Sequence, residues 1–185
     1  MTDLQHYTPG PANLAQVRPC KDENKRTLVL VRELRHSPEK VWEALTDPAQ
    51  LREWAPFVVD ANLGMTESVK LTWVGNPVPI DTKVKRAEPP HVLEYGDIRW
   101  ELEPTAGGTR LTLWANIDRR FVSMGAAGWH IAYDVLERLL SGNPIGRIAG
   151  AEAMKFEGWK RLNEEYAQQF GVKAPKWPPK ADQKL

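Results

Sequence analysis

Residues 128–142, GWHIAYDVLERLLSG, bring together side chains that can do acid–base chemistry. His130 and Asp134 are four residues apart, and Glu137 follows three residues later. On a helix, such spacings place side chains on neighbouring positions of one face. A histidine beside a carboxylate can act as a general base in a shielded site. The stretch is therefore either a catalytic pair or the wall of a site that holds a ligand.

A helical projection separates these polar residues from an apolar stripe. At about 100° per residue, Trp129, Tyr133, Leu136 and Leu140 fall within roughly 60° of one another. His130 falls in the middle of the polar arc. There a solvated or capping role is predicted in preference to catalysis, metal binding or a buried hydrogen bond. The apolar arc spans about 200°, which is too wide for one flat sheet, so we expect a curved sheet to grip this helix on several sides.

The segments that precede this helix are predicted to position it. Residues 27–34 alternate in polarity, with Leu28, Leu30, Arg32 and Leu34 on one face of a strand. Two helix starts follow in SPEK and DPAQ, where a capping side chain precedes a proline at the first helical position. The strand therefore leads into two short helices.

After the short helices the pattern changes to a two-residue period. Short turns separate the alternating segments, which is typical of an antiparallel sheet with one solvated face. The alternating segments lie at 67–74, 82–88, 91–95, 97–103 and 110–117. The C-terminal third is predicted to hold two helices, at 123–141 and 151–170, joined by the connection GNPIGRIAG, with Gly171 just past the second helix.

Composition and chain ends limit the classes of protein. The 25 basic and 24 acidic side chains nearly balance, which argues against a nucleic-acid partner. A single cysteine, Cys20, excludes an internal disulfide framework and fits a reducing compartment. We expect no signal peptide and no membrane span, hence a soluble, cytoplasmic protein. Residues 1–26 are predicted to form an irregular arm, 27–171 the domain, and 172–185 a Lys- and Pro-rich tail, flexible unless Trp177 docks.

Other familiar chemical motifs are missing. The histidines are far apart and show no zinc spacing. There is no G-x-S-x-G elbow, and the Gly-rich connection lacks the Lys-Ser/Thr of a phosphate loop. We therefore predict no catalytic residue set, no metal and no cofactor.

Three stretches together carry a family resemblance: VRELRHSPEKVWEALTDPAQLREW, LEPTAGGTRLTL and GWHIAYDVLERLLSG. They resemble the START-like (SRPBCC) superfamily, in the branch similar to the C-terminal domain of the activator of the ninety-kilodalton heat-shock protein ATPase. The match spans about residues 27–170. It implies an α+β helix-grip fold, a curved antiparallel sheet around a long C-terminal helix, often with an apolar cavity between them. The activator's separate N-terminal domain is missing here, which argues against a direct co-chaperone role.

Strand alternation and the helical stripe together predict the lining of that cavity. The predicted ligand-binding residues are Arg32, Trp54, Trp73, Ile98, Trp100, Leu113, Met124, Trp129, Tyr133 and Leu136. Arg32 and Tyr133 are the polar groups expected to reach the ligand. Arg32 suits a carboxylate, and its alternative role is a salt bridge to a neighbouring Glu.

The favoured function is binding of a small apolar or amphipathic molecule, without catalysis. The first alternative is a stress-related module for a chaperone or other protein, using the outer sheet face around Trp114. Trp114 is otherwise expected to form a dimer contact or, in preference, to pack under the arm or against another intramolecular partner. The second alternative is a cyclase- or hydratase-type enzyme, which would need a group such as His130 or Glu101 inside the cavity. Monomer and homodimer both remain open.

Overall fold

The computed structural model describes residues 7–176, so the predictions for Trp177 and the end of the tail lie outside the described residues. One eight-stranded sheet, antiparallel throughout, runs in the order β1-β2-β8-β7-β6-β5-β4-β3. The strands are β1 (Ala15–Pro19), β2 (Lys25–Leu34), β3 (Phe57–Val59), β4 (Ser68–Trp73), β5 (Ile80–Glu88), β6 (Val92–Tyr95), β7 (Ile98–Thr105) and β8 (Gly108–Asp118).

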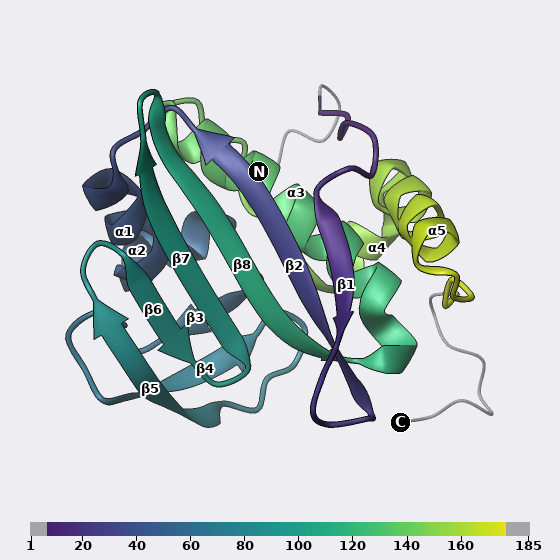
Figure 1. The fold of residues 1–185 in the computed structure, drawn as a ribbon, viewed down its shortest axis with the longest axis horizontal. Coiled ribbons are helices and arrows are strands. Elements are labelled where there is room, and N and C mark those ends of the chain that lie inside the picture. The colour runs from purple at the N-terminus through teal and green to yellow at the C-terminus, as the bar shows by residue number, and fades with distance from the viewer. Residues whose placement is uncertain (1–6, 177–185) are drawn as a thin grey trace.

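Helices lie on the inner side of this sheet and at its ends (Figure 1). They are α1 (Pro38–Thr46), α2 (Pro48–Trp54), the short 3-10 helix η2 (Arg119–Phe121), α3 (Val122–Leu140), α4 (Gly150–Lys155) and α5 (Glu157–Phe170). In the described part of the chain, no helix is long and apolar enough to cross a membrane.

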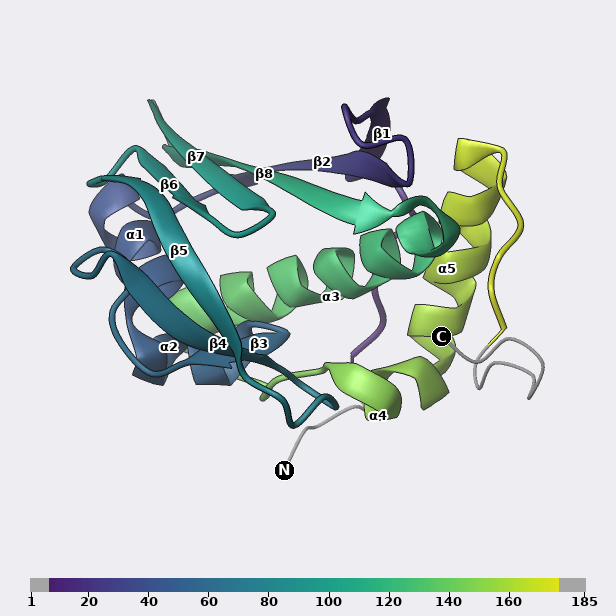
Figure 2. The ribbon, with the colours of Figure 1, turned by 90° about the horizontal axis from the view of Figure 1, so that it is seen from below.

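The sheet curls around α3. Figure 2 shows α3 running between the β2–β8 part of the sheet and the β3–β5 part, which curves round to the other side of the helix. Helix α5 packs against α3 away from the sheet, and α2 packs near its C-terminal half. The predicted α+β helix-grip fold is confirmed, and the wide apolar arc of α3 reflects this enclosure.

The two short helices begin where their capping signals predict. The Ser37 hydroxyl accepts a hydrogen bond from the backbone N–H of Lys40, and Asp47 accepts one from Ala49. Each cap precedes a proline, which has no N–H to leave unsatisfied at the first helical position. The caps therefore fix where α1 and α2 begin. Both helices follow β2 in the chain and pack against α3.

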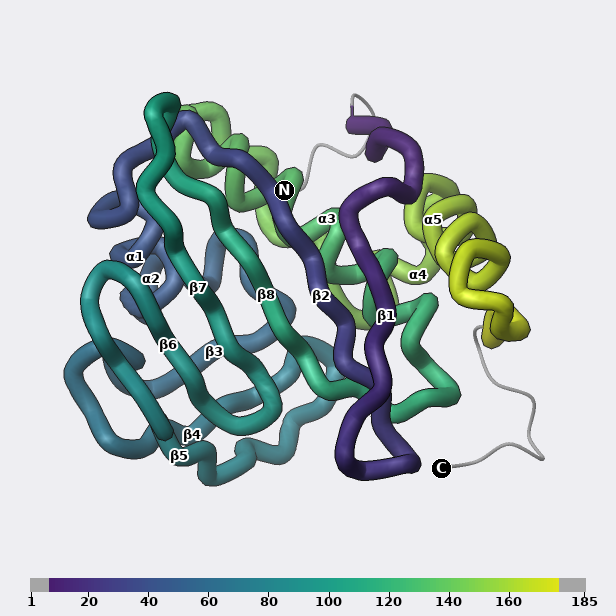
Figure 3. Tube along the Cα trace, viewed as in Figure 1, coloured from purple at the N-terminus to yellow at the C-terminus, as the bar shows by residue number. Residues whose placement is uncertain are grey.

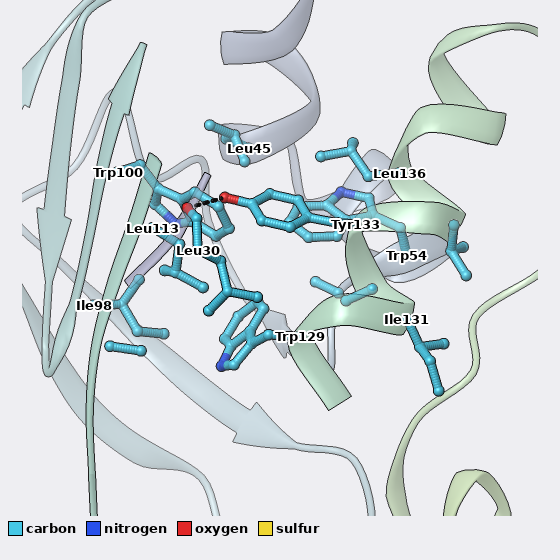
Figure 4. Packing of buried hydrophobic residues seen from close by; sticks show 14 of the residues in the cluster. Leu30, Leu45, Trp54, Ile98, Trp100, Leu113, Trp129, Ile131, Tyr133 and Leu136 are labelled. Carbon is cyan, nitrogen blue, oxygen red and sulfur yellow. Dashed lines mark hydrogen bonds between the residues drawn. The ribbon is translucent and has the colours of Figure 1, made fainter. Parts of the chain in front are cut away.

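The core lies between the inner face of the sheet and α3. Figure 4 shows Tyr133 and Trp129 of α3 facing Trp100 and Leu113 of the sheet. The Tyr133 hydroxyl lies 3.1 Å from the carbonyl oxygen of Leu30 and donates to it, so this buried ring ties the helix to β2. Leu28, Leu30 and Leu34 of β2 face the core and are buried, and Val31 on the other face is exposed, but Val29 is buried as well, so burial alternates only in the second half of the strand.

Three local expectations are corrected. Residues 15–19, predicted to be irregular, form the edge strand β1. The sequence AQVRP shows no alternation that would predict a strand. Strand β1 is ordered instead by its pairing with β2 and by the contacts of the N-terminal segment with α5, which lies beside it (Figure 3). The single helix predicted over 151–170 is broken at Phe156, which has extended backbone angles. The three-residue strand β3 was not predicted, because it is too short to show a period.

Candidate functional site

A cavity of about 450 Å³ lies where the curled sheet meets the N-terminal half of α3. Its volume falls within the range of roughly 300–1,000 Å³ that small-molecule sites occupy. Most of its wall is hydrocarbon or aromatic ring. The residues that line it are Pro56, Leu71, Trp73, Ile80, Thr82, Tyr95, Gly96, Asp97, Ile98, Ala115, Asn116, Ile117, Gly125, Gly128 and Trp129.

Glycines on α3 keep one side of this cavity open. A Cβ added at Gly128 would meet no other heavy atom within 4 Å. Glycine in a helix interior is less favourable than alanine by about 1 kcal/mol, and neither a positive φ nor a close contact requires it at this position. Gly128 therefore leaves empty space at a position where the helix would tolerate a side chain.

Aromatic rings from separate elements make the inner wall. The Phe57 ring contacts the rings of Trp73, Tyr95 and Trp129 edge to face, with centroids 5.4–6.5 Å apart. Trp129 also packs edge to face on Trp100 at 5.7 Å. Such edge-to-face contacts are favourable and orient the rings, so the wall presents a fixed aromatic surface.

Polar groups at the cavity are few and mostly engaged. The Thr82 hydroxyl donates to the carbonyl of Ile80, and Asn116 accepts from the hydroxyl of Thr27. Asp97 lies at the exposed edge in an ion pair with Lys25. Burial raises the pKa of the Tyr95 phenol, which therefore stays neutral and accepts a hydrogen bond from Trp100. The inner part of the cavity carries no formal charge among the described residues.

The ten predicted site residues fall into three groups. Trp73, Ile98 and Trp129 line the cavity directly. Five others are enclosed in the core behind it and do not border the cavity: Trp54, Trp100, Leu113, Tyr133 and Leu136. Met124 is partly buried against the core and Arg32 lies on the other side of Tyr133, its guanidinium 5.8 Å from that ring.

Arg32 is held by carboxylates of α3. Its guanidinium donates to Asp134 at 2.5 Å and to Glu137 at 3.3 Å. Asp134 in turn accepts a hydrogen bond from the hydroxyl of Tyr7, in the segment before β1. This geometry corresponds to the salt-bridge alternative for Arg32, although its partners are an aspartate and a glutamate of the helix.

The solvated role predicted for His130 is wrong. The side chain is only 2% exposed, because α5 covers this side of α3 and places the Tyr166 hydroxyl 2.8 Å from Nδ1. Burial is the main cause that lowers the pKa of His130 to about 4, and the nearby Asp134 carboxylate only partly opposes it. The imidazole is therefore neutral near pH 7 and lies on the opposite side of α3 from the cavity, so it cannot act there as a base.

Sequence reasoning missed several lining residues. Thr82, Tyr95 and Gly128 reach the cavity from β5, the end of β6 and α3. The unexplained glycine within a predicted helix was the available signal for Gly128, because such a residue needs a structural reason. Trp114 lies on the outer face of the sheet, with the guanidinium of Arg99, from the neighbouring strand β7, 6.0 Å from its ring, which corresponds to the predicted alternative of an intramolecular partner other than the arm.

Comparison with known families gives the class of the protein. The model of the family described as polyketide cyclase / dehydrase and lipid transport matches residues 25–143, more than half of the chain. The chain therefore belongs to this family, which is of the SRPBCC type. No curated protein matches the chain. The finer likeness to the heat-shock activator stays a prediction.

Solved structures share the fold. The crystal structure of CalU16 from Micromonospora echinospora is 21% identical over 83% of this chain and 94% of that one, with a TM-score of 0.60. A conserved protein of unknown function from Enterococcus faecalis is 15% identical over 86% and 92% of the two chains, with a TM-score of 0.63. A protein from Mesorhizobium loti is 27% identical over 63% and 98%, with a TM-score of 0.56.

Proposed function

We propose that the protein binds a small apolar or amphipathic molecule in the cavity between the sheet and α3. The observation that carries the proposal is the cavity of about 450 Å³, lined by Trp73, Ile98 and Trp129 and left open by Gly128. An apolar ligand enclosed there would be removed from water together with the surface of the aromatic rings. This burial would favour binding by about 25 cal/mol for each Å² of apolar surface removed from water. The family description, which includes lipid transport, supports this class of ligand.

The proposal assigns different tasks to the predicted site residues. Trp73, Ile98 and Trp129 would touch the ligand. The enclosed side chains behind them, such as Trp54, Trp100 and Leu136, would hold the aromatic wall in place. Arg32 and Tyr133 would stabilise the fold, because hydrogen bonds within the protein already engage their polar atoms.

Native mass spectrometry of the purified protein tests the proposal directly. We expect an adduct of a small molecule that is retained on gentle ionisation and lost on denaturation. A second arm adds a fluorescent apolar probe, a neutral naphthyl ketone, and measures its affinity.

A matched pair of variants locates the bound molecule. Gly128→Leu places a branched side chain in the cavity and should weaken probe binding at least tenfold. Gly128→Ala adds a single methyl group and should leave binding within about twofold. If wild-type protein carries no adduct and binds no probe, or if both variants bind like wild type, the cavity is not the binding site.

A further inference from the structure

We propose that the indole N–H of Trp129 selects ligands that carry an uncharged hydrogen-bond acceptor, such as a ketone or quinone oxygen, over plain hydrocarbons and over carboxylates. This inference rests on the proposed binding function and names the chemical class of the ligand.

The first observation is an unpaired donor. Trp129 is 5% exposed, and within residues 7–176 its indole nitrogen has no hydrogen-bond partner. That nitrogen is not fully enclosed by protein atoms. Trp129 lines the cavity, so the cavity is the space from which the nitrogen can be reached. Figure 4 shows the nitrogen on the edge of the ring that faces away from Trp100 and Tyr133. The N–H is therefore free to meet a ligand in the cavity.

The second observation is the contrast with Trp54 and Trp100, the buried tryptophans of the same aromatic cluster. The Trp54 indole donates to the carbonyl of Ala44 at 2.9 Å, and the Trp100 indole donates to the hydroxyl of Tyr95 at 3.1 Å. Buried tryptophans usually find such partners. Trp159 of α5 also has no partner for its indole nitrogen in the described part of the chain, but it does not border the cavity.

Because the Trp129 nitrogen is reached from the cavity, water can satisfy it there, and a ligand that displaces this water without replacing its hydrogen bond loses affinity. Trp129 has no hydrogen-bond acceptor within the described part of the chain, so a ligand that fills the cavity must bring its own acceptor to keep this hydrogen bond.

The third observation is the charge around the cavity. Arg32 is bound to Asp134 and Glu137, and Lys25 is paired with Asp97 at the cavity edge. Among the described residues no cation lines the cavity. A buried carboxylate without a cation is strongly disfavoured, so the acceptor that suits Trp129 is a neutral oxygen.

Trp73 provides a matched comparison in the same cavity. It also lines the cavity, and its indole nitrogen has no partner in the described part of the chain, but its side chain is partly exposed. Water can still reach the donor at that position when a ligand fills the cavity, so a ligand acceptor would gain less there. The selection should therefore depend on Trp129 and not on Trp73.

Three probes of similar shape test the inference: 2-acetylnaphthalene, 2-isopropylnaphthalene and 2-naphthoate at pH 7.5. We expect the ketone to bind wild-type protein about 3- to 10-fold more tightly than the hydrocarbon, the ratio that one hydrogen bond supplies. The carboxylate should bind at least tenfold more weakly than the ketone. Isothermal titration calorimetry measures all three affinities.

Two variants and one spectroscopic signal complete the test. Trp129→Phe should remove the preference for the ketone, and Trp73→Phe should keep it within about twofold. In the ¹⁵N–¹H spectrum of wild-type protein, the indole signal that is missing from Trp129→Phe should move downfield with the ketone but not with the hydrocarbon. The variant is needed only to assign this signal, which is the one missing when the remaining seven indole signals are matched to wild type. The contact itself is measured on wild-type protein, so mild destabilisation of Trp129→Phe does not affect the test.

Each alternative outcome has a distinct meaning. If ketone and hydrocarbon bind equally, or if Trp129→Phe weakens them by the same factor, the cavity binds apolar molecules without this selection, and the inference is wrong while the proposed function stands. Tighter binding of the carboxylate would also overturn it. If none of the probes binds wild-type protein and no adduct is retained, the proposed function fails together with the inference.

Discussion

The hydroxyl of Tyr166 lies 2.8 Å from Nδ1 of His130 and also accepts backbone hydrogen bonds from Leu14 and Ala15. Because the oxygen accepts two N–H groups, its own proton is free to be donated to His130. The imidazole then carries its proton on Nε2, which lies 4.0 Å from Asp134. One phenol therefore joins α5, α3 and the segment that leads into β1.

Removing this hydroxyl should destabilise the protein. Tyr166→Phe leaves two backbone N–H groups and the His130 acceptor without their partner, at an expected cost of about 1–3 kcal/mol in the free energy of unfolding. Urea denaturation at pH 7.5 measures the change. A double-mutant cycle with His130→Asn separates the contribution of the pair from that of the backbone contacts. A change below about 0.5 kcal/mol would show that water replaces the phenol without loss.

The buried imidazole should make stability depend on pH. The folded-state pKa of His130 is lowered to about 4 from an ordinary value of 6.5, because burial disfavours the imidazolium. Between these two values the unfolded chain binds more protons than the folded protein, so stability should fall as pH decreases from about 6.5 to about 4. The nearby Asp134 and Glu165 carboxylates oppose the shift, while Arg32 and Arg161 add to it.

Urea denaturation at pH 7.5, 6.0 and 5.0 checks this dependence. His130→Asn retains an acceptor near the position of Nδ1 but cannot titrate, so it should reduce the slope between pH 6.5 and 5. His91→Gln removes an exposed histidine and serves as control, with little expected change. Equal slopes in wild type and His130→Asn would mean that His130 does not govern this range.

The two glycines of α3 at the cavity should respond differently to alanine. Gly128→Ala should raise the free energy of unfolding by about 0.5–1 kcal/mol, because the helix gains propensity and the methyl group meets no neighbour. A Cβ at Gly125 would lie 2.5 Å from Cδ1 of Ile117 and 3.2 Å from Cδ1 of Leu28. Gly125→Ala should therefore gain less or lose stability, and thermal unfolding of the two variants measures the difference.

Arg32 should matter for stability and not for ligand affinity. Its side chain is 15% exposed, and Arg32→Met leaves Asp134 without its cationic partner, which we expect to cost about 1–3 kcal/mol. Arg110→Met is the matched control, since its ion pair with Glu33 is exposed and should contribute less than about 1 kcal/mol. Probe affinity should stay within about twofold in both variants. A tenfold loss in Arg32→Met alone would restore Arg32 as a ligand contact.

Much of the fold could be predicted because its signals are local. The caps at Ser37 and Asp47 and the alternation in the second half of β2 depend on residues close in sequence, and the structure confirms them. Strand β1 could not be predicted, because its order comes from pairing with β2 and from Tyr166, far along the chain.

The candidate site was less accessible to sequence reasoning. A helical projection gives the direction of a side chain but not what packs there, so the side of α3 that carries His130 was taken as solvated although α5 covers it. The same projection placed Trp129 and Tyr133 on one stripe, yet Trp129 borders the cavity while Tyr133 is sealed behind it. That distinction depends on the curvature of the sheet and on the space left by Gly128.

Helix α3 bears the cavity on one side and the junction with α5 and the N-terminal segment on the other. Gly128 and Trp129 belong to the first side, and His130 and Asp134 to the second. Substitutions at the cavity positions can therefore change which molecule fits without disturbing the contacts of α3 with α5 and the N-terminal segment. Such a division would let relatives of this protein diverge in ligand while keeping one scaffold, and it makes Gly128 a suitable first position for redesigning specificity.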